Sequence, residues 1–362
     1  MQFHMPPIGS RMAATDNATH GRVDMASNDR VLVLGATGGI GGEAARQLRD
    51  AGWEVRALRR AGTSAVRPAA GSSTVRSAAG TPVEHKDGIV WLRGDALRGE
   101  DVAAAAAGCS VIVHAVNPPA YRRWPQLVLP MLDNTIAAAA NEQATVVLPG
   151  TVYNYGPDAY RLVTEDAPQN PVTRKGAIRV AMERRLESFS QAGGRVLIVR
   201  AGDFFGPAAA NNWFSQGLIR PGRAVTRISY PGRAGVGHQW AYLPDVARTM
   251  LELLKRRDSL QRFAAFHMEG HWDHDGTQMA QAIRRVVARR TGIEPAVTAF
   301  PWWLIAAGAP IVETFREMRE MRYLWRVPVR MVNDRLRSVL GAEPRTPLEQ
   351  AVEASLGGLG CI

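Results

Sequence analysis

Three glycines, Gly35, Gly38 and Gly41, stand at intervals of three residues, a spacing that suits phosphate binding. Where side chains are missing, the chain can turn tightly, a pyrophosphate can approach the backbone, and a helix can pack closely on a strand. A helix that begins here would direct its free N–H groups and its positive dipole end at the phosphates. We therefore predict a nucleotide site. Its predicted contacts are Gly35, Thr37, Gly38, Gly39, Ile40 and Gly41.

The residues around these glycines have the pattern that such a site requires. Residues 30–34 form an apolar run of strand length, and Ile40, Ala44 and Leu48 follow with helical spacing. A second predicted strand, residues 54–58, comes after Gly52. A glycine triplet alone could be an ordinary turn, but its place between a strand and a helix favours a dinucleotide site.

Five further apolar runs continue the alternation of strand and helix. They are residues 89–92, 111–115, 144–148, 196–199 and 263–268. The sequence thus predicts an α/β fold with a doubly wound parallel sheet (Rossmann) of about seven strands and a small C-terminal substrate lobe.

We expect the domains to divide in the following way. Residues 29–205 form the dinucleotide-binding domain, and residues 238–268 add a helix and a strand to it. Residues 206–237 and 269–362 form the substrate-binding lobe. Residues 1–28 have no hydrophobic period and are expected to be a disordered tail. Residues 61–87, rich in Ala, Gly, Ser and Thr, are expected to be an irregular insertion at the rim.

Composition narrows the function classes. The net charge is +11, but the basic residues are scattered with acids nearby, so we interpret the charge as a compositional bias and not as a nucleic-acid surface. A basic surface would still attract anionic ligands such as a phosphorylated cofactor. No apolar run is long enough to cross a bilayer. Cys109 and Cys361 give neither a disulfide framework nor metal-ligand spacing, so we expect a cytoplasmic protein without a metal.

The end of the second predicted strand suggests which dinucleotide binds. Arg59 and Arg60 stand where an acidic residue would accept the ribose hydroxyls of NAD. Arginine can pair instead with a 2′-phosphate, which indicates NADP, with NAD as the alternative. The plainer interpretation is that both arginines are simply solvated.

The Gly-x-x-Gly-x-x-Gly spacing resembles the extended and atypical branches of the short-chain dehydrogenase/reductase superfamily, which include the NAD-dependent epimerase/dehydratase family. The resemblance implies that Asp95 and Ala96 lie near the adenine and that His114 and Ala115 lie beneath the nicotinamide ribose. Asp95 could instead only shape a turn, and His114 could be a packed histidine. Asp203 stands where the family often has asparagine.

The segment Pro149–Pro157 resembles the family's Ser-Ser-x-x-Val-Tyr-Gly, which places Thr151 at the hydroxyl that bonds the substrate oxygen. The family's Tyr-x-x-x-Lys pair is missing from the sequence. In the register marked by Glu183, Lys175 takes the tyrosine position and Arg179 the lysine position. Because these two are four residues apart, they share one helical face.

Three outcomes follow for the chemistry. Arg179 could bind the ribose or a phosphate, and Lys175, if desolvated, could act as general acid or base and contact the cofactor. Otherwise Tyr121, Tyr153 or Tyr155 supplies a phenol, or no hydride chemistry takes place. In the plainer interpretation the two basic residues form an exposed face, with Arg179 paired to Glu183.

We therefore expect an NADP-preferring oxidoreductase or epimerase that transfers hydride at a carbonyl or alcohol carbon of a small molecule. The alternative is a catalytically silent NADP-binding sensor, which the missing tyrosine favours. Met318, Met321 and Trp325 recur at helical spacing, so they belong either to a core or to the face of a homodimer.

Overall fold

The computed structural model describes residues 29–60, 73–76, 82–118, 124–209 and 212–362. The predicted tail, residues 1–28, and Tyr121 lie outside these ranges. A sheet of nine strands runs through the molecule in the order β13-β9-β7-β6-β1-β2-β5-β4-β3. The first seven in this order pair in parallel, so the predicted doubly wound sheet is confirmed.

The parallel strands lie close to the predicted runs. They are β1 (Arg30–Leu34), β2 (Glu54–Arg59), β5 (Ile89–Arg93), β6 (Val111–His114), β7 (Thr145–Thr151), β9 (Arg195–Ala201) and β13 (Phe263–His267). They read as continuous apolar runs because helices cover both faces of the sheet. Val31 and Val33 of β1 enter one core, and Leu32 and Leu34 enter the other.

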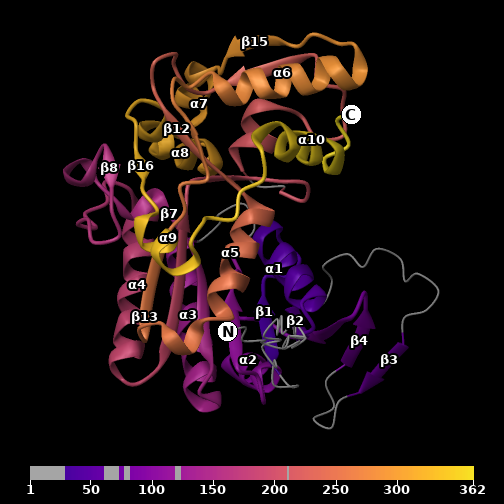
Figure 1. The fold of residues 1–362 in the computed structure, drawn as a ribbon, viewed down its shortest axis with the longest axis vertical. Helices are drawn as coiled ribbons and strands as arrows, with labels where there is room; N and C mark the ends of the chain where they lie inside the picture. Colours follow the sequence, from indigo (N-terminus) through magenta and orange to yellow (C-terminus); the bar gives the residue numbers. More distant parts are fainter. Residues whose placement is uncertain (1–28, 61–72, 77–81, 119–123, 210–211) are drawn as a thin grey trace, which may run out of the picture.

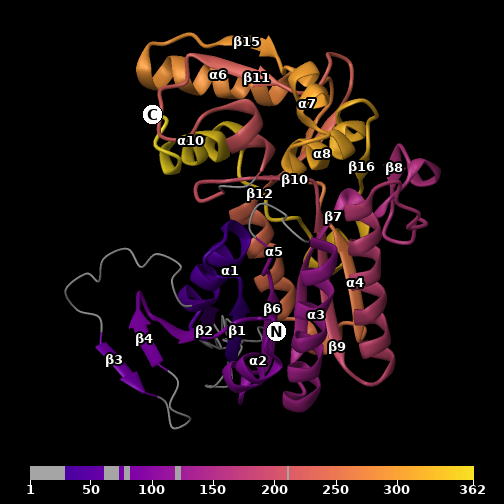
Figure 2. The same cartoon turned by 180° about the vertical axis from the view of Figure 1, so that it is seen from behind.

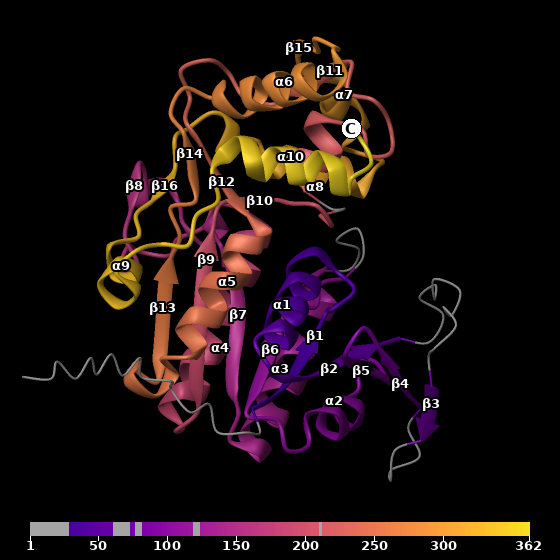
Figure 3. The same cartoon turned by 45° about the vertical axis from the view of Figure 1, so that its right-hand side comes forward.

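Helices on the two faces come from different parts of the chain (Figures 1 and 3). One core is covered by α1 (Gly39–Asp50) and α5 (Leu243–Leu254). The other is covered by α2 (Gly99–Ala106), α3 (Trp124–Glu142) and α4 (Arg174–Gln191). Among the described residues, no helix is long and apolar enough to span a membrane.

The expectation of an irregular insertion over residues 61–87 is wrong where the structure describes that segment. β4 (Pro82–Lys86) pairs antiparallel with β5, and β3 (Ser73–Arg76) pairs antiparallel with β4 (Figure 2). Val83 stands opposite Leu92, and both side chains are buried in the same core. Without β4, β5 would be an edge strand with unpaired backbone N–H and C=O groups. These groups pair with β4, although the sequence of β4 does not show a strand pattern.

A smaller lobe lies beyond the carboxyl ends of the parallel strands, at the top of Figure 1. Its strands are β10 (Asp203–Phe205), β11 (Arg227–Tyr230), β12 (His238–Tyr242), β14 (His271–Asp273) and β15 (Ala296–Ala299). Its helices are α6 (Gln278–Thr291), α7 (Trp302–Gly308), α8 (Glu313–Glu320) and α10 (Leu348–Gly358), and the 3-10 turn η6 (Met321–Trp325) follows α8. Met321 and Trp325 are buried. Of the two predicted alternatives, a core or a homodimer face, these two residues therefore belong to a core.

Three further elements are short. β8 (Leu162–Val163) pairs with β16 (Arg330–Met331), and α9 (Asp334–Leu340) follows β16.

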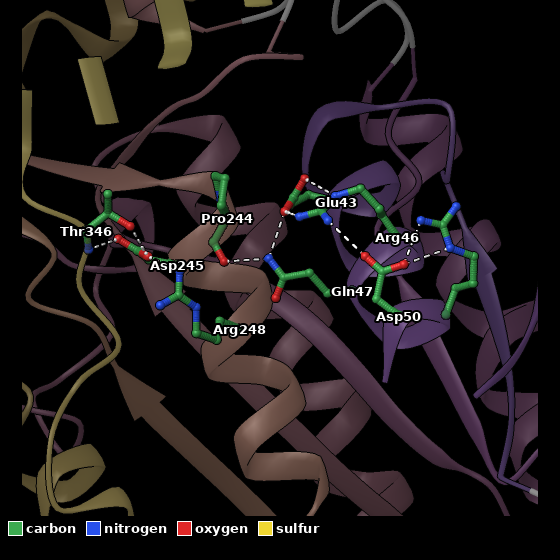
Figure 4. A network of polar contacts seen from close by, with 9 residues as sticks. Glu43, Arg46, Gln47, Asp50, Pro244, Asp245, Arg248 and Thr346 are labelled. Atoms are coloured by element: carbon green, nitrogen blue, oxygen red, sulfur yellow. Dashed lines mark hydrogen bonds and ion pairs between the residues drawn. The ribbon is translucent and has the colours of Figure 1, made fainter. Parts of the chain in front are cut away.

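Polar contacts join α1, α5 and the segment before α10 (Figure 4). The Gln47 amide donates to the Pro244 carbonyl (2.8 Å). The buried Asp245 carboxylate accepts from the Thr346 backbone N–H (2.7 Å) and hydroxyl (2.8 Å). These contacts tie the segment that leads into the lobe's last helix to the sheet's helical layer.

Candidate functional site

A cavity of about 460 Å³ opens at the carboxyl ends of β1, β2 and β6. Its lining includes most of the predicted contacts: Gly35, Thr37, Gly38, Gly39, Ile40, Arg59, Arg60, Asp95, Ala96, His114, Ala115, Thr151 and Arg179. Gly41 and Lys175 do not line it. The strand order reverses between β6 and β1, and ligands of open parallel sheets bind at such a switch point.

The glycine turn is shaped by close backbone contacts. Gly35 has a φ of +90°, and a Cβ there would lie 2.5 Å from the Ala115 oxygen. A Cβ on Gly41 would lie 2.3 Å from the Gly35 oxygen, so Gly41 serves packing rather than contact with a ligand. Gly38 is the N-cap of α1 and offers no capping side chain. The free N–H groups of this helix end thus remain for a pyrophosphate, and the turn fits a dinucleotide.

At the opposite end of the cavity, Arg59 and Arg60 differ in their surroundings. Arg59 is half-buried, forms an ion pair with Glu84 of β4, and lies over the Trp91 ring (5.6 Å to its centroid). Arg60 is exposed. Asp95 accepts a hydrogen bond from the backbone N–H of Leu97 (3.0 Å), so its carboxylate also shapes the turn.

His114 is 2% exposed and presents a lone pair to the site. The Thr135 hydroxyl donates to the Met131 carbonyl (3.0 Å), so it accepts from His114 Nδ1–H (2.7 Å). Within the described residues, His114 Nε2 has no hydrogen-bond partner. Burial, and next the charge of Arg179, lowers the pKa of His114 to about 3, so the ring is neutral and Nε2 is an acceptor.

Thr151 ends β7 and begins the next turn. Its hydroxyl oxygen accepts from the Tyr153 backbone N–H (3.4 Å) and caps the 3-10 turn η2 (Val152–Asn154). Tyr153 lines the cavity together with Thr151. The Tyr153 phenol donates to Asp203 Oδ1 (2.9 Å) on β10. Thr151 and Tyr153 therefore line the same cavity.

The two basic residues of α4 have different surroundings. The helix begins at the Thr173 cap, whose hydroxyl oxygen accepts from Gly176 N–H (3.0 Å). Lys175 is 6% exposed, and its Nζ lies 3.2 Å from Glu317 Oε2 on α8. Burial lowers the pKa of Lys175 from its ordinary value, against the opposing charge of Glu317. Arg179 lines the cavity and lies over the Trp124 ring (5.4 Å to its centroid).

Glu183, the partner that the plainer interpretation gave to Arg179, is engaged elsewhere. Its carboxylate forms a buried ion pair with Arg200 of β9 (2.7 Å). Arg179 Nη1 donates to the Pro149 carbonyl (3.4 Å). The exposed basic face of that interpretation is therefore not what the structure shows.

Sequence reasoning missed one pair beside this site. Asp203 Oδ2 lies 2.9 Å from His238 Nε2, although 35 positions separate them in the chain. The only signal was Asp203 itself, an acid where the resembling family often has asparagine. Its partner could not be found because it comes from β12 of the lobe.

Comparison with known proteins agrees with this fold. The model of the NAD dependent epimerase/dehydratase family matches residues 31–288. Among curated proteins, no sequence matches significantly. A putative epimerase from Burkholderia cenocepacia J2315 has 19% identity and a TM-score of 0.67, over 92% of this chain and 98% of that one.

Two further solved structures are similar. WbmH of Bordetella bronchiseptica, solved in complex with NAD+, has 17% identity and a TM-score of 0.63, over 91% of this chain and 97% of that one. MoeE5, solved with UDP-glucose and NAD, has 19% identity and a TM-score of 0.64, over 91% of this chain and 98% of that one. At these identities the structures establish likeness of fold.

Proposed function

We propose that this chain, which belongs to the NAD-dependent epimerase/dehydratase family, transfers hydride at a carbonyl or alcohol carbon of a small molecule, with NADP preferred. One observation carries the proposal: a single cavity extends from the glycine turn to Thr151 and Arg179. It unites a phosphate-binding helix end with a hydroxyl suited to hold a reacting oxygen. We propose that residues 206–237 and 269–362 cover the substrate.

The roles of the chain's own residues follow from their contacts. A bound nicotinamide dinucleotide would supply or accept the hydride. We propose that the Gly35–Gly39 backbone holds its pyrophosphate and that His114 Nε2 accepts from one of its hydroxyls. Thr151 orients the substrate oxygen, because a hydroxyl can donate to a carbonyl or accept from an alcohol. Arg179, which keeps its charge at all working pH values, binds a ribose oxygen or a phosphate.

The preference for NADP rests on the arginines at the end of β2. Arg60 is the exposed one, whereas Glu84 already neutralises part of the charge of Arg59. We therefore propose that Arg60 contributes more than Arg59 to binding a 2′-phosphate. A charge-assisted hydrogen bond contributes about 1.5–3 kcal/mol, or about tenfold or more in affinity.

Arg60→Ala is expected to weaken NADPH binding about tenfold and to leave NADH binding nearly unchanged. Arg59→Ala is expected to have a smaller effect. Isothermal titration of each variant with both dinucleotides measures the difference. Arg46→Ala is the matched control, since that arginine pairs with Glu43 and Asp50 on α1 and does not line the cavity. Equal losses for NADPH and NADH in Arg60→Ala would argue against the assignment.

The second candidate function is a silent sensor of NADP. It is favoured by the placement of Lys175, whose Nζ faces Glu317 instead of lining the cavity. An assay with a panel of aldehydes and ketones, in which NADPH oxidation is measured as the loss of its absorbance, separates the two functions. Tight NADPH binding without turnover of any carbonyl would support the sensor.

We further propose that the substrate carries an anionic group. A second cavity of about 270 Å³ in the lobe is lined by aromatic rings and arginines, among them Tyr230, Arg233, Trp302, Arg322, Trp325 and Arg326. Burial, and next the neighbouring arginines, lowers the pKa of Arg322. Within the described residues, no carboxylate forms an ion pair with Arg233, Arg322 or Arg326. Phosphate or carboxylate groups would supply that countercharge.

Because MoeE5 was solved with UDP-glucose, UDP is the first probe for this cavity. UDP is expected to bind, and Arg322→Ala is expected to weaken that binding about tenfold by removing a charge-assisted contact. Isothermal titration gives both affinities. Arg284→Ala, on α6 and paired with Glu294, is the control. If both variants bind UDP like the unaltered chain, the lobe cavity is not the anion site.

A further inference from the structure

A chain of hydrogen bonds leads from the cavity into the lobe. It starts at Tyr153, which lines the cavity two residues after Thr151. The phenol donates to Asp203 Oδ1 (2.9 Å), and the other carboxylate oxygen, Oδ2, faces His238 Nε2 (2.9 Å). This series connects solvent-accessible space to a buried ionisable pair.

The Asp203–His238 pair holds a proton. The side chains of His238 and Asp203 are 5% and 4% exposed. His238 Nδ1 faces the Leu324 carbonyl (3.1 Å), which can only accept, so Nδ1 carries hydrogen. Nε2 faces a carboxylate oxygen, and a hydrogen must lie between them. This hydrogen resides on the imidazole or on the carboxyl, and in either state the pair is neutral overall, which suits a buried position.

Packing fixes the imidazole in place. The His238 ring stacks on Trp325, with centroids 3.7 Å apart and planes 6° apart, and Trp240 meets its edge at 4.9 Å. The ring is therefore held by aromatic contacts on two sides and by hydrogen bonds at both nitrogens. The imidazole can therefore release or take up a proton without moving.

Other ionisable groups face Asp203 from the elements packed around it. They are Lys175 of α4, Tyr230 of β11 and Tyr323 of η6. Glu317 pairs with Lys175 (3.2 Å), and the charges of Glu317 and Asp203 both oppose the lowering of the Lys175 pKa by burial. Tyr153, from the turn before α4, brings a phenol side chain to the residues that line the cavity.

We propose that Tyr153 exchanges a proton with the reacting oxygen of the substrate and that the Asp203–His238 pair replenishes it. This inference rests on the proposed function. In carbonyl reduction, the carbonyl carbon gains a hydride from the nicotinamide dinucleotide, which is oxidised. The carbonyl oxygen takes the Tyr153 proton as the Tyr153 O–H bond breaks. Asp203 takes the proton that it shares with His238, and its carboxyl group turns to give that proton to the Tyr153 phenolate. The pair is left one proton poorer, and solvent restores this proton before the next turnover. Alcohol oxidation reverses each transfer.

The first test detects the coupling between Tyr153 and the Asp203–His238 pair, here called the relay, without enzymatic turnover. In the full chain labelled with ¹⁵N-histidine, the His238 ring signals are identified by their loss in His238→Gln. Tyr153→Phe removes one donor from Asp203, so the proton shared with His238 is expected to move toward the carboxylate and to shift the Nε2 signal. Tyr155→Phe is the matched control, because the Tyr155 phenol bonds His267 and Arg200.

The second test uses phenanthrenequinone and benzaldehyde as carbonyl probes with NADPH. Tyr153→Phe is expected to lower kcat about 100-fold or more, while NADPH affinity stays unchanged. Asp203→Asn and His238→Gln are expected to lower kcat and to alter its pH profile, which a purely structural role would not do. Tyr155→Phe is expected to keep the pH profile.

The outcomes distinguish failure of the relay from failure of the proposed hydride-transfer function. If the unaltered chain reduces a probe and Tyr153→Phe does so at the same rate, the relay is overturned and the hydride-transfer function stands. If Tyr153→Phe leaves the His238 signals unchanged, the relay is also overturned. If the unaltered chain binds NADPH yet reduces neither probe, the hydride-transfer function fails, and the relay's catalytic role fails with it. A lower kcat together with a shifted His238 signal supports the proposal.

Discussion

Arg200→Ala is expected to destabilise the protein by about 3–5 kcal/mol, because it leaves a buried carboxylate without its counterion. The Arg200 and Glu183 side chains are 3% and 5% exposed, and Arg200 Nη2 lies 2.7 Å from Glu183 Oε2. Arg200 Nη1 also donates to the Tyr155 phenol oxygen (2.8 Å). The midpoint and slope of urea unfolding measure the change.

Two controls give this prediction its meaning. Arg46→Ala removes an exposed arginine and is expected to cost no more than about 1 kcal/mol. The double variant Arg200→Leu with Glu183→Leu removes both charges and is expected to be more stable than Arg200→Ala, since no unpaired charge stays buried. If the three variants unfold at the same urea concentration, the ion pair does not matter for stability.

Thr151→Val is expected to lower kcat about 100-fold or more, if the hydroxyl holds the reacting oxygen as proposed. The side chain lines the cavity and ends β7, where its hydroxyl oxygen also caps the following turn (3.4 Å). Loss of that cap is expected to cost about 1 kcal/mol of stability. Steady-state kinetics with NADPH and a carbonyl probe measure kcat, and urea unfolding measures stability.

Thr151→Ser separates the two effects, because serine keeps both the hydroxyl and the cap. It is expected to retain most of the kcat and most of the stability. If Thr151→Val keeps the full kcat, another group orients the substrate oxygen.

The parallel sheet could be predicted because each strand is a local apolar run. The strand at Arg30–Leu34 is buried on both faces, so its sequence alone marks it. The glycine turn could also be predicted, because its signal lies in a few neighbouring residues. β4 could not be predicted, since its pairing depends on the free edge of β5, and Val83 is the only buried residue in the described part of the strand, residues 83–86. A short strand of mixed composition carries little signal of its own.

The site was harder to predict because its contacts span the chain. Helical spacing predicted that Lys175 and Arg179 share one face of a helix. Lys175 is buried, and Arg179 lines the cavity. The spacing could not show that Lys175 pairs with Glu317, which lies on a helix far along the chain. It also could not show that Arg179 lines the cavity. The same holds for Asp203 and His238, which meet because β10 pairs with β12 within the lobe.

The position of β13 has a consequence for synthesis on the ribosome. This strand completes the sheet by pairing with β9, yet about 60 residues separate the two. At roughly 5–20 residues per second, the nascent chain would expose the apolar edge of β9 for roughly 3–12 seconds. A free strand edge can pair with another chain, so slow translation or crowded polysomes would favour aggregation before β13 emerges.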